Sequence, residues 1–228
     1  MLAKLGADIV EVFRNAFPSL LSGMGVTIKT TALSLAIALF LGLFACLMGM
    51  SKIAPLRWLS KFYIWIIRGT PFIVQLFIIY FGIPQLVQSA GVSFRISTQT
   101  AAVTTLALNA GAYISEIFRG GINAVDIGQM EAARSLGLTK GMAMRKVVLP
   151  QAVRICIPSL CNQFIITLKD TSLAATIALA EVVYQGKIYV GRTMQSFATY
   201  VLIGIMYLVV ISILSAIIRH IERKLANE

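Results

Sequence analysis

Residues 126–150 read DIGQMEAARSLGLTKGMAMRKVVLP, a polar stretch between two long apolar segments. Asp126, followed three residues later by Gln129, is typical of a capping box that opens a helix. Gly137 is expected to end this helix, and the residues from Leu138 to Leu149 are predicted to form a second short helix, which Pro150 would end. Two short helices at an angle would make a compact knob that enters a groove of a partner, although an ordinary solvated loop fits the same pattern.

The chain around this stretch is too apolar for a soluble domain. Of its 228 residues, 58% are hydrophobic and 13% are charged, whereas globular proteins have roughly 45–50% and about 25%. Five segments reach the ~20 mostly apolar residues that a membrane-crossing helix needs. These segments are Val26–Met50, Phe62–Val87 (interrupted by Arg68-Gly69-Thr70-Pro71), Gln99–Phe118, Ile155–Ala180 and Ala198–Ile218. The sequence therefore predicts an all-α integral membrane protein with five transmembrane helices.

The basic residues predict the orientation of these helices. The formal net charge is +11, and most Lys and Arg residues lie in the loop of residues 119–150, in the connection between the first two spans and after the fifth span. Cytoplasmic loops carry the excess of Lys and Arg, so this loop and the C-terminus are predicted inside the cell and the N-terminus outside. Cations placed in this way indicate membrane topology, and no nucleic-acid partner is expected.

The two ends of the chain lie outside the predicted spans. Residues 1–22 have apolar side chains at helical spacing, and Asp8 and Glu11 interrupt any signal-peptide core, which favours a helix lying in the outer membrane interface. Residues 222–228 are expected to form a short cytoplasmic tail. The three cysteines lie in apolar stretches without metal-type spacing, so neither a disulfide framework nor a metal site is expected.

Polar side chains within the predicted spans mark a candidate path. Ionisable groups are costly inside a membrane and are commonly functional. Glu116 follows Asn109 and Tyr113 on one helix face, because the three are spaced i, i+4 and i+7. Arg68 lies at a similar depth on another span, so Arg68 and Glu116 are predicted to pair, either as part of the path or as a purely structural ion pair. The candidate path residues are Thr70, Gln75, Asn109, Tyr113, Glu116, Asn162, Asp170 and Ser172.

The adjacent charges Lys169 and Asp170 lie inside the fourth predicted span. Neighbouring helical residues point about 100° apart, so either the helix breaks here, as transporter helices do around binding sites, or the two charges contact different neighbours. Lys169 is expected in a structural ion pair. Asp170 would suit the ammonium group or the cationic side chain of an amino acid, or else a gate contact between subunits. Asn162 and Gln163 could line the path, or they could serve the packing of helices.

Several motifs resemble one family of membrane proteins. Glu131-Ala132-Ala133, Gly137, Val147 and Leu149-Pro150 have the spacing of the EAA loop of ABC importer permeases, with Val147 where Ile is usual. Three further stretches are similar to the polar-amino-acid branch of that family, the histidine, glutamine and arginine type. They are Arg68–Pro71 with Gln75, Asn109–Glu116 and Leu168–Leu173, and the resemblance covers residues 27–221.

The resemblance implies the permease subunit of a type I importer in the inner (cytoplasmic) membrane of a prokaryote, with residues 23–221 as the permease domain and residues 119–150 as its coupling loop. The implied partners are two ATPase subunits, a second permease copy or a related permease, and an extracytoplasmic amino-acid-binding protein. The ATPase subunits would receive Glu131, Ala132, Ala133 and Gly137. They would also bind ATP and Mg²⁺, since this chain has no Gly-x-x-x-x-Gly-Lys-[Ser/Thr] loop. The chain is therefore expected to be a transporter subunit without a cofactor of its own, not an enzyme.

The expected function is ATP-driven import of a polar or basic L-amino acid, namely arginine, histidine, lysine or glutamine. The alternative is an ion-coupled secondary amino-acid transporter in which Glu116 and Asp170 relay charge. Many such transporters contain inverted repeats, and the sequence shows no convincing internal repeat. A membrane enzyme is disfavoured because the spans carry no catalytic constellation.

Overall fold

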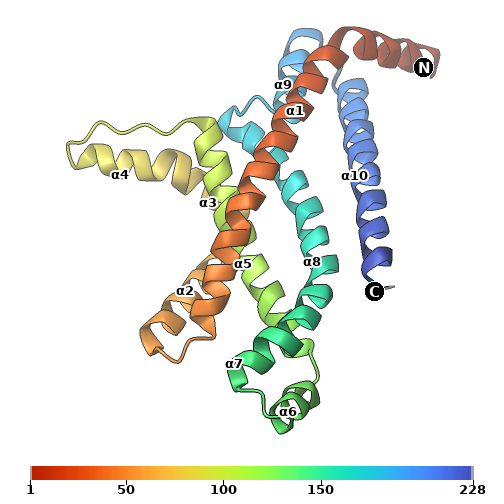
Figure 1. The fold of residues 1–228 in the computed structure, drawn as a ribbon. Helices are drawn as coiled ribbons and strands as arrows, with labels where there is room; N and C mark the ends of the chain where they lie inside the picture. Colours follow the sequence, from red (N-terminus) through yellow and green to blue (C-terminus); the bar gives the residue numbers. More distant parts are fainter. Residues whose placement is uncertain (1, 227–228) are drawn as a thin grey trace.

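The computed structural model describes the backbone of residues 2–226 and the side chains of residues 9–220. Over this part of the chain all regular structure is helical (Figure 1). The elements are α1 (Leu2–Gly49), α2 (Ala54–Gly69), α3 (Phe72–Phe77), the π-helical turn η1 (Ile78–Gly82), α4 (Ile83–Ser89), α5 (Thr98–Ala124), α6 (Ile127–Ser135), α7 (Lys140–Ala143), the π-helical turn η2 (Met144–Val148), α8 (Leu149–Asp170), the 3-10 helix η3 (Thr171–Ile177), α9 (Val182–Thr193) and α10 (Ser196–Ala226).

Helix α1 is longer than the first predicted span. It runs without a break from the N-terminal region through residue 22 to Gly49, so the expected segment 1–22 is not a helix of its own. Pro18 lies inside α1, where it removes a backbone hydrogen bond and favours a bend, and Figure 1 shows α1 bent near its N-terminal end. Val12, Ala16 and Leu20 are buried in a cluster with residues of α9 and α10. The apolar pattern expected before residue 9 lies outside the described side chains.

Four helical segments in the described part of the chain are long and apolar enough to cross a membrane: Ile9–Gly49, Phe72–Ser89, Thr98–Ala124 and Ser196–His220. Three of them include most of a predicted span. The predicted fourth span, Ile155–Ala180, corresponds to α8 and η3 and is not among the four. Its polar residues, such as Asn162, Gln163 and Lys169, lower its hydropathy. Helix α10 continues to Ala226, so the expected tail of residues 222–228 begins inside that helix.

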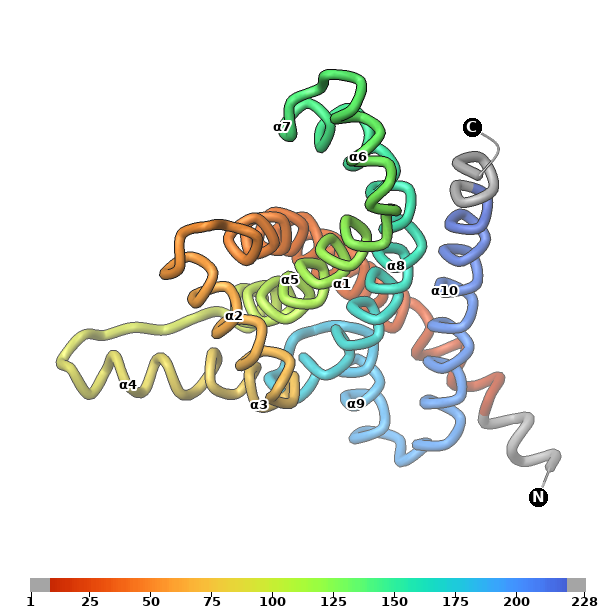
Figure 2. The backbone as a smooth tube through the Cα atoms, turned by 90° about the horizontal axis from the view of Figure 1, so that it is seen from below, coloured from red at the N-terminus to blue at the C-terminus, as the bar shows by residue number. Residues whose placement is uncertain are grey.

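The predicted second span, Phe62–Val87, is not one straight segment. Helix α2 ends at Gly69, Thr70 and Pro71 have extended backbone conformations, and α3 begins at Phe72. The interruption is the one that Gly69 and Pro71 predict, since glycine ends helices and proline excludes the helical conformation from the residue before it. Beyond α3, helix α4 leaves the bundle, as Figures 1 and 2 show.

The centre of the bundle is the pair formed by α1 and α5. Their backbones approach closely because glycine lies at the contact: a Cβ atom on Gly42 would lie 2.6 Å from the Ile114 Cγ2 atom, and one on Gly111 would lie 3.1 Å from the Leu41 Cβ atom. Small residues at helix contacts are typical of membrane proteins, where dispersion forces replace the hydrophobic effect between helices. Leu35 and Ala38 of α1 are buried in a cluster with Ala110 and Ile114 of α5.

Helix α9 is held against α1 by a close backbone contact and a buried carboxylate. A Cβ atom on Gly23 would lie 2.8 Å from the Val182 Cα atom, so glycine is required there. The fully buried Glu181 accepts a hydrogen bond from the Tyr184 backbone N–H at 2.8 Å, which caps α9. Its other carboxylate oxygen accepts from the Thr27 hydroxyl at 3.4 Å.

Helices α6 and α7 project from one end of the bundle, the end toward which α2 also lies (Figure 1). The second short helix expected at Leu138–Leu149 is α7 followed by η2, and it continues into α8 without ending at Pro150. The expectation failed because the Leu149 N–H bonds to the Met144 carbonyl, five residues back. This widened turn sets Pro150 at the first turn of α8, where the absent N–H is not needed.

Candidate functional site

The α6–α7 loop begins with a side-chain cap. The Asp126 carboxylate accepts a hydrogen bond from the Gly128 backbone N–H at 2.6 Å, which satisfies one free donor of the α6 N-terminus. The capping box is incomplete, because the Gln129 side-chain oxygen instead accepts from the Gln151 amide at 3.3 Å. Gln151 also donates to the Val147 carbonyl at 3.0 Å. This glutamine pair ties α6 to the first turn of α8.

The C-terminus of α6 is closed by Gly137. The Leu138 N–H donates to the Ala133 carbonyl at 3.2 Å, and the Gly137 N–H donates to the Arg134 carbonyl at 3.0 Å, which is the pattern of a Schellman motif. Gly137 adopts a φ of 87°, a left-handed conformation that side chains with a Cβ atom disfavour. The glycine six residues after Glu131 therefore sets the turn between α6 and α7.

The members of the Glu131–Gly137 motif differ in exposure. Ala133 is buried, as are Ala143 and Val148, which follow it in this part of the chain. Glu131 and Ala132 are exposed, and no carboxylate–cation pair of the described residues includes Glu131. Two large apolar side chains of the loop are also exposed: Ile127 by 74% and Leu136 by 85%. The surface of the loop thus carries an unpaired carboxylate and exposed apolar side chains. The hydrogen bonds at Asp126 and at Gly137 fix the backbone that holds them.

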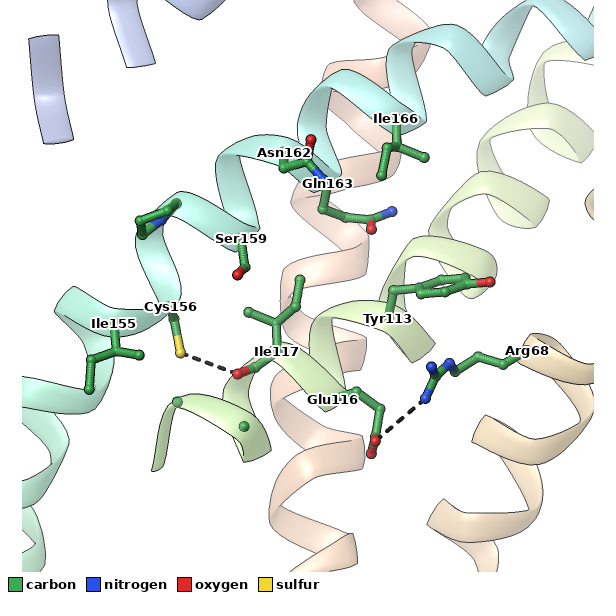
Figure 3. Close-up of a pocket in the computed structure, with 13 residues that line it drawn as sticks. Arg68, Tyr113, Glu116, Ile117, Ile155, Cys156, Ser159, Asn162, Gln163 and Ile166 are labelled. Atoms are coloured by element: carbon green, nitrogen blue, oxygen red, sulfur yellow. Dashed lines mark hydrogen bonds and ion pairs between the residues drawn. The ribbon is translucent and has the colours of Figure 1, made fainter. Parts of the chain in front are cut away.

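A second polar feature is a pocket of about 730 Å³ between α2, α5 and α8 (Figure 3). Its walls bring together five of the residues singled out in the sequence: Arg68, Tyr113, Glu116, Asn162 and Gln163. Gly120 adds open backbone on α5, and Ser159 adds a hydroxyl group on α8. The pocket therefore combines charged, hydroxyl, amide and aromatic groups.

The charged wall of the pocket centres on Glu116. Arg68 Nη1 lies 3.5 Å from Glu116 Oε2, so the predicted pair is present, and the Arg68 guanidinium carbon lies 5.4 Å from the centre of the Tyr113 ring. Arg119 contacts Glu116 more closely, through Nε to Oε1 at 3.0 Å and Nη2 to Oε2 at 2.6 Å. A bidentate contact of this kind fixes the carboxylate in orientation and charge. Arg68 is the weaker partner of Glu116, and its cation also faces the Tyr113 π-system.

The wall formed by α8 is uncharged. Figure 3 shows Ser159, Asn162 and Gln163 along one side of the helix, with Gln163 directed toward α5. Gln163 is buried, and its amide lies 3.4 Å from the Thr167 hydroxyl. Asn162 is exposed in the pocket. The Cys156 thiol donates to the Ile117 carbonyl at 3.4 Å and so links the two walls at the lower end of the pocket.

Thr70, Gln75 and Asn109 form a separate network at the break between α2 and α3. The Gln75 amide nitrogen lies 2.8 Å from the Ile67 carbonyl, 3.0 Å from the Thr70 carbonyl and 2.9 Å from the Thr70 hydroxyl. The Gln75 oxygen accepts from Asn109 Nδ2 at 3.0 Å. Gln75 is buried, and none of the three residues lines the pocket of Figure 3. Their bonds satisfy the backbone groups that the helix break leaves open.

Lys169, Asp170 and Ser172 also lie outside that pocket. The α-helix ends at Asp170 and tightens into η3, so the change of helix expected at these charges does occur. Among the described residues neither Lys169 nor Asp170 belongs to an ion pair, and the Ser172 hydroxyl donates to the Lys169 carbonyl at 2.6 Å. No group of three His, Cys, Asp or Glu side chains in the described part of the chain could hold a metal ion.

Arg119 and Ser159 are residues of this site that the sequence predictions did not select. Arg119 follows Glu116 by three residues on one helix, and this spacing favours contact between opposite charges, so the sequence could have predicted it. Ser159 lies one helix turn beyond Ile155 on α8, and only the packing of α8 against α5 turns it toward the pocket.

Comparison with known proteins gives a consistent result over nearly the whole chain. Residues 42–227 match the family described as binding-protein-dependent transport system inner membrane component. The probable amino-acid permease protein YxeN of Bacillus subtilis (strain 168) is 40% identical over 217 residues, which are 95% of this chain and 96% of that protein. The arginine transport system permease protein ArtQ of the same organism is 38% identical over 210 residues, 92% of this chain and 94% of that protein.

A solved structure has the same architecture. The structure described as "Crystal structure of an amino acid ABC transporter with histidines" aligns with a TM-score of 0.86 and 41% sequence identity, covering 91% of this chain and 94% of the other. At this identity, both the fold and the sequence connect the two chains.

Proposed function

The chain belongs to the family of binding-protein-dependent transport system inner membrane components, as an amino-acid ABC importer permease, and we propose that it carries a polar L-amino acid inward when separate ATPase subunits pull on its α6–α7 loop. The observation that carries this proposal is the exposed surface of that loop, where Glu131 has no partner in the described chain. A helix docks into a groove of a partner through exposed apolar side chains, and a charged group beside them fixes the orientation of the contact.

The loop is built to transmit force to two long helices. Helix α5 ends at Ala124, two residues before the Asp126 cap, and α7 continues through η2 into α8. Gln151 adds a side-chain link between α6 and α8. A displacement of the loop would therefore tilt α5 and α8 together. Because these helices form two walls of the pocket in Figure 3, the tilt would open or close it, as in a shift between two packed states.

The pocket offers complementary groups to an amino acid. Arg68, which Glu116 holds only at 3.5 Å, would receive the substrate carboxylate, and Glu116 would receive the ammonium group. Asn162 and Gln163 would bind a polar side chain. Since Arg119 already neutralises Glu116 at 2.6 Å, the pocket does not require a cationic side chain, and glutamine suits it as well as arginine, histidine or lysine. Asp170 and Ser172 would act at another stage of the path.

The arrangement in the membrane follows from the same proposal. Five crossings, including the more polar α8, would place the N-terminus outside and the α6–α7 loop in the cytoplasm of a prokaryotic cell. A polar fourth crossing is tolerated where it faces a water-filled path or a protein neighbour. A second copy or a related permease would complete the path, and an extracytoplasmic binding protein would deliver the amino acid. ATP and Mg²⁺ would bind only to the ATPase subunits.

The test is uptake of labelled amino acids by vesicles that contain the chain, its ATPase and its binding protein. We expect Glu131→Ala to lower ATP-driven uptake at least ~10-fold, the effect of losing one strong interface contact, without lowering the thermal stability of the chain. Lys187→Ala is the matched control, since Lys187 is an exposed charge on α9 outside the loop. Competition with unlabelled arginine, histidine, lysine and glutamine identifies the substrate.

Two outcomes would contradict the proposal. Normal uptake by Glu131→Ala would remove the loop from the coupling contact. Accumulation driven by an ion gradient in vesicles that hold this chain alone would favour the secondary transporter, a class to which none of the matched relatives described above belongs.

A further inference from the structure

Helix α2 divides into a buried face and an exposed aromatic face. On the buried face the Ser60 hydroxyl donates to the Ala45 carbonyl of α1 at 2.7 Å, and the Tyr63 hydroxyl donates to the Leu108 carbonyl of α5 at 2.6 Å. On the exposed face Trp58 and Trp65 are 72% and 71% accessible, and Phe62 lies between them. These two hydroxyl contacts fix α2 in rotation, so the aromatic side chains are held outward.

Two cations lie between these faces. Arg57 and Lys61 are one helix turn apart, so they point to the same side of α2, next to the tryptophans. One pocket of about 530 Å³, between α1, α2 and α5, is lined by Arg57, Lys61 and Arg119, and a second of about 580 Å³ lies on the outer surface of α2. Arg57, Lys61 and Trp65 line both pockets. The two cations therefore border both pockets, and the outer one lies on the aromatic face; these two pockets are called the hollow below.

The positive charge of this hollow is not compensated within the described chain. Glu116 is the carboxylate that lines the inner pocket, and Arg119 holds it through both of its oxygens at 3.0 and 2.6 Å. Arg57 and Lys61 have no carboxylate within 4.0 Å among the described residues. An anion that entered the hollow would meet two free cations.

We propose that Arg57 and Lys61, together with Trp58 and Trp65, bind the headgroup of an anionic phospholipid. Basic pockets between transmembrane helices attract anionic headgroups, with about a fivefold gain in binding for each Lys or Arg. Tryptophan side chains settle at the headgroup level of a membrane, and the apolar ring faces would lie along the acyl chains. The site belongs to the leaflet on the side of the α6–α7 loop, because α2 extends toward that end of the molecule (Figure 1).

A second copy of this chain is a poorer occupant of the same surface. In a two-fold symmetric contact the same patch of both copies is buried, so the Arg57 and Lys61 cations of both copies would be brought into one interface. Like charges brought together in this way repel each other. An anionic lipid removes that repulsion and covers the aromatic face at the same time.

The two tryptophans provide the test, because they are the only ones in the chain and both flank the proposed site. The full chain is placed in vesicles that contain equal fractions of lipid brominated on the acyl chain, either phosphatidylglycerol or phosphatidylcholine, and quenching of tryptophan fluorescence is measured. We expect stronger quenching by the brominated phosphatidylglycerol. Arg57→Gln combined with Lys61→Gln should lower this preference by about fivefold for each cation removed, while quenching by phosphatidylcholine stays unchanged and shows that α2 remains exposed to lipid.

The matched control is Lys187→Gln combined with Arg192→Gln, which removes the same charge from the exposed surface of α9. This variant should keep the preference for phosphatidylglycerol. Equal quenching by the two lipids in the native chain, or an equal loss of preference in both double variants, would overturn the proposal. Absence of quenching by either lipid would show that protein covers α2. Loss of the preference in excess inorganic phosphate, but not in sodium chloride of the same ionic strength, would assign the hollow to a free anion and would equally overturn it.

Discussion

Two of the breaks between helices in the described chain, at Gly137 and at Gly69–Pro71, are closed in different ways. At Gly137 the neighbouring backbone supplies the bonds, from Leu138 to Ala133 and from Gly137 to Arg134. At the break between α2 and α3 a side chain from the next helix supplies them, since the Gln75 amide reaches the Ile67 and Thr70 carbonyls. In an exposed loop, water can bond to any backbone N–H or C=O group that has no partner in the protein. At a helix break within a membrane there is no such water, so the protein itself must supply the partners.

The difference has a functional consequence for the permease. The α6–α7 turn is local, and its exposed surface is the one that we propose as the contact with an ATPase subunit. The α2–α3 break is joined through Asn109 to the helix that carries Glu116, because Asn109 Nδ2 donates to Gln75 at 3.0 Å. The break therefore holds α2, with Arg68 at its C-terminal end, in register with the charged wall of the pocket.

The largest loss of stability is expected from Gln75→Leu, which removes the hydrogen bonds that hold the break between α2 and α3. The substitution removes the donor for two backbone carbonyls and the acceptor for Asn109, and buried polar groups without partners cost about 1–3 kcal/mol each. We expect the free energy of unfolding to fall by about 3 kcal/mol, measured by titration with sodium dodecyl sulfate. Gln85→Leu is the control, because Gln85 is exposed on α4. Equal losses in the two variants would show that the Gln75 bonds do not stabilise the break.

Two glycine substitutions in the α6–α7 loop are expected to change its stability by smaller amounts, one lowering it and the other raising it. Gly137→Ala places a Cβ atom on a residue with a φ of 87° and should destabilise the turn by about 1 kcal/mol. Gly141→Ala, in α7 with open space around its Cα atom, should stabilise the helix by a similar amount. Hydrogen exchange measures both changes, the first at the amides from Ala132 to Leu138 and the second at the amides of α7 and η2. Slower exchange in Gly137→Ala would contradict the assignment of the left-handed turn.

The smallest effect is expected from Thr70→Val, which refines the account of the α2–α3 break. The Thr70 hydroxyl donates to the Ile66 carbonyl at 2.8 Å and is one of three acceptors around the Gln75 amide. Thr70 is exposed, and Gln75 keeps its two carbonyl partners. The free energy of unfolding should therefore fall by only about 0.5–1 kcal/mol, measured by the same titration with sodium dodecyl sulfate.

Thr176→Val is the matched control for Thr70→Val. Thr176 is another exposed threonine, and its hydroxyl donates to a carbonyl at 2.7 Å but accepts nothing from a glutamine. A loss in Thr70→Val as large as that in Gln75→Leu would mean that the hydroxyl, not the carbonyl contacts, holds the break.

The elements predicted well from the sequence are those with local causes. The Asp126 cap and the turn at Gly137 depend on residues within a few positions of one another, and so does the interruption before Pro71. Arg68 and Glu116 could be paired by comparing their depths along two spans. The contact between Arg119 and Glu116 could also have been predicted, since Arg119 follows Glu116 by three residues on one helix face.

The predictions that failed depended on adjustments that a sequence pattern does not encode. Pro150 was expected to end a helix, but the widened turn at Met144–Val148 lets the helix pass through it. Residues 1–22 were expected to form a separate helix, but Val12, Ala16 and Leu20 are buried with α9 and α10 in one continuous α1. The assignment of Gln75 to the transport path stays a prediction, and the structure adds that the Gln75 amide bonds to the Ile67 and Thr70 carbonyls and to Asn109.

The amino-acid sequence alone determined that this protein is helical, that it belongs in a membrane and that its polar loop turns at Gly137, because composition, periodicity and backbone preference act over short stretches of chain. The tertiary structure decided which polar groups meet. It brought Arg68 of α2 and Asn162 of α8 to opposite walls around Glu116, joined Gln75 to Asn109, and left Arg57 and Lys61 without a carboxylate. Such meetings depend on helix rotation and close packing between distant segments, which small residues such as Gly42 and Gly111 permit only when the whole bundle assembles.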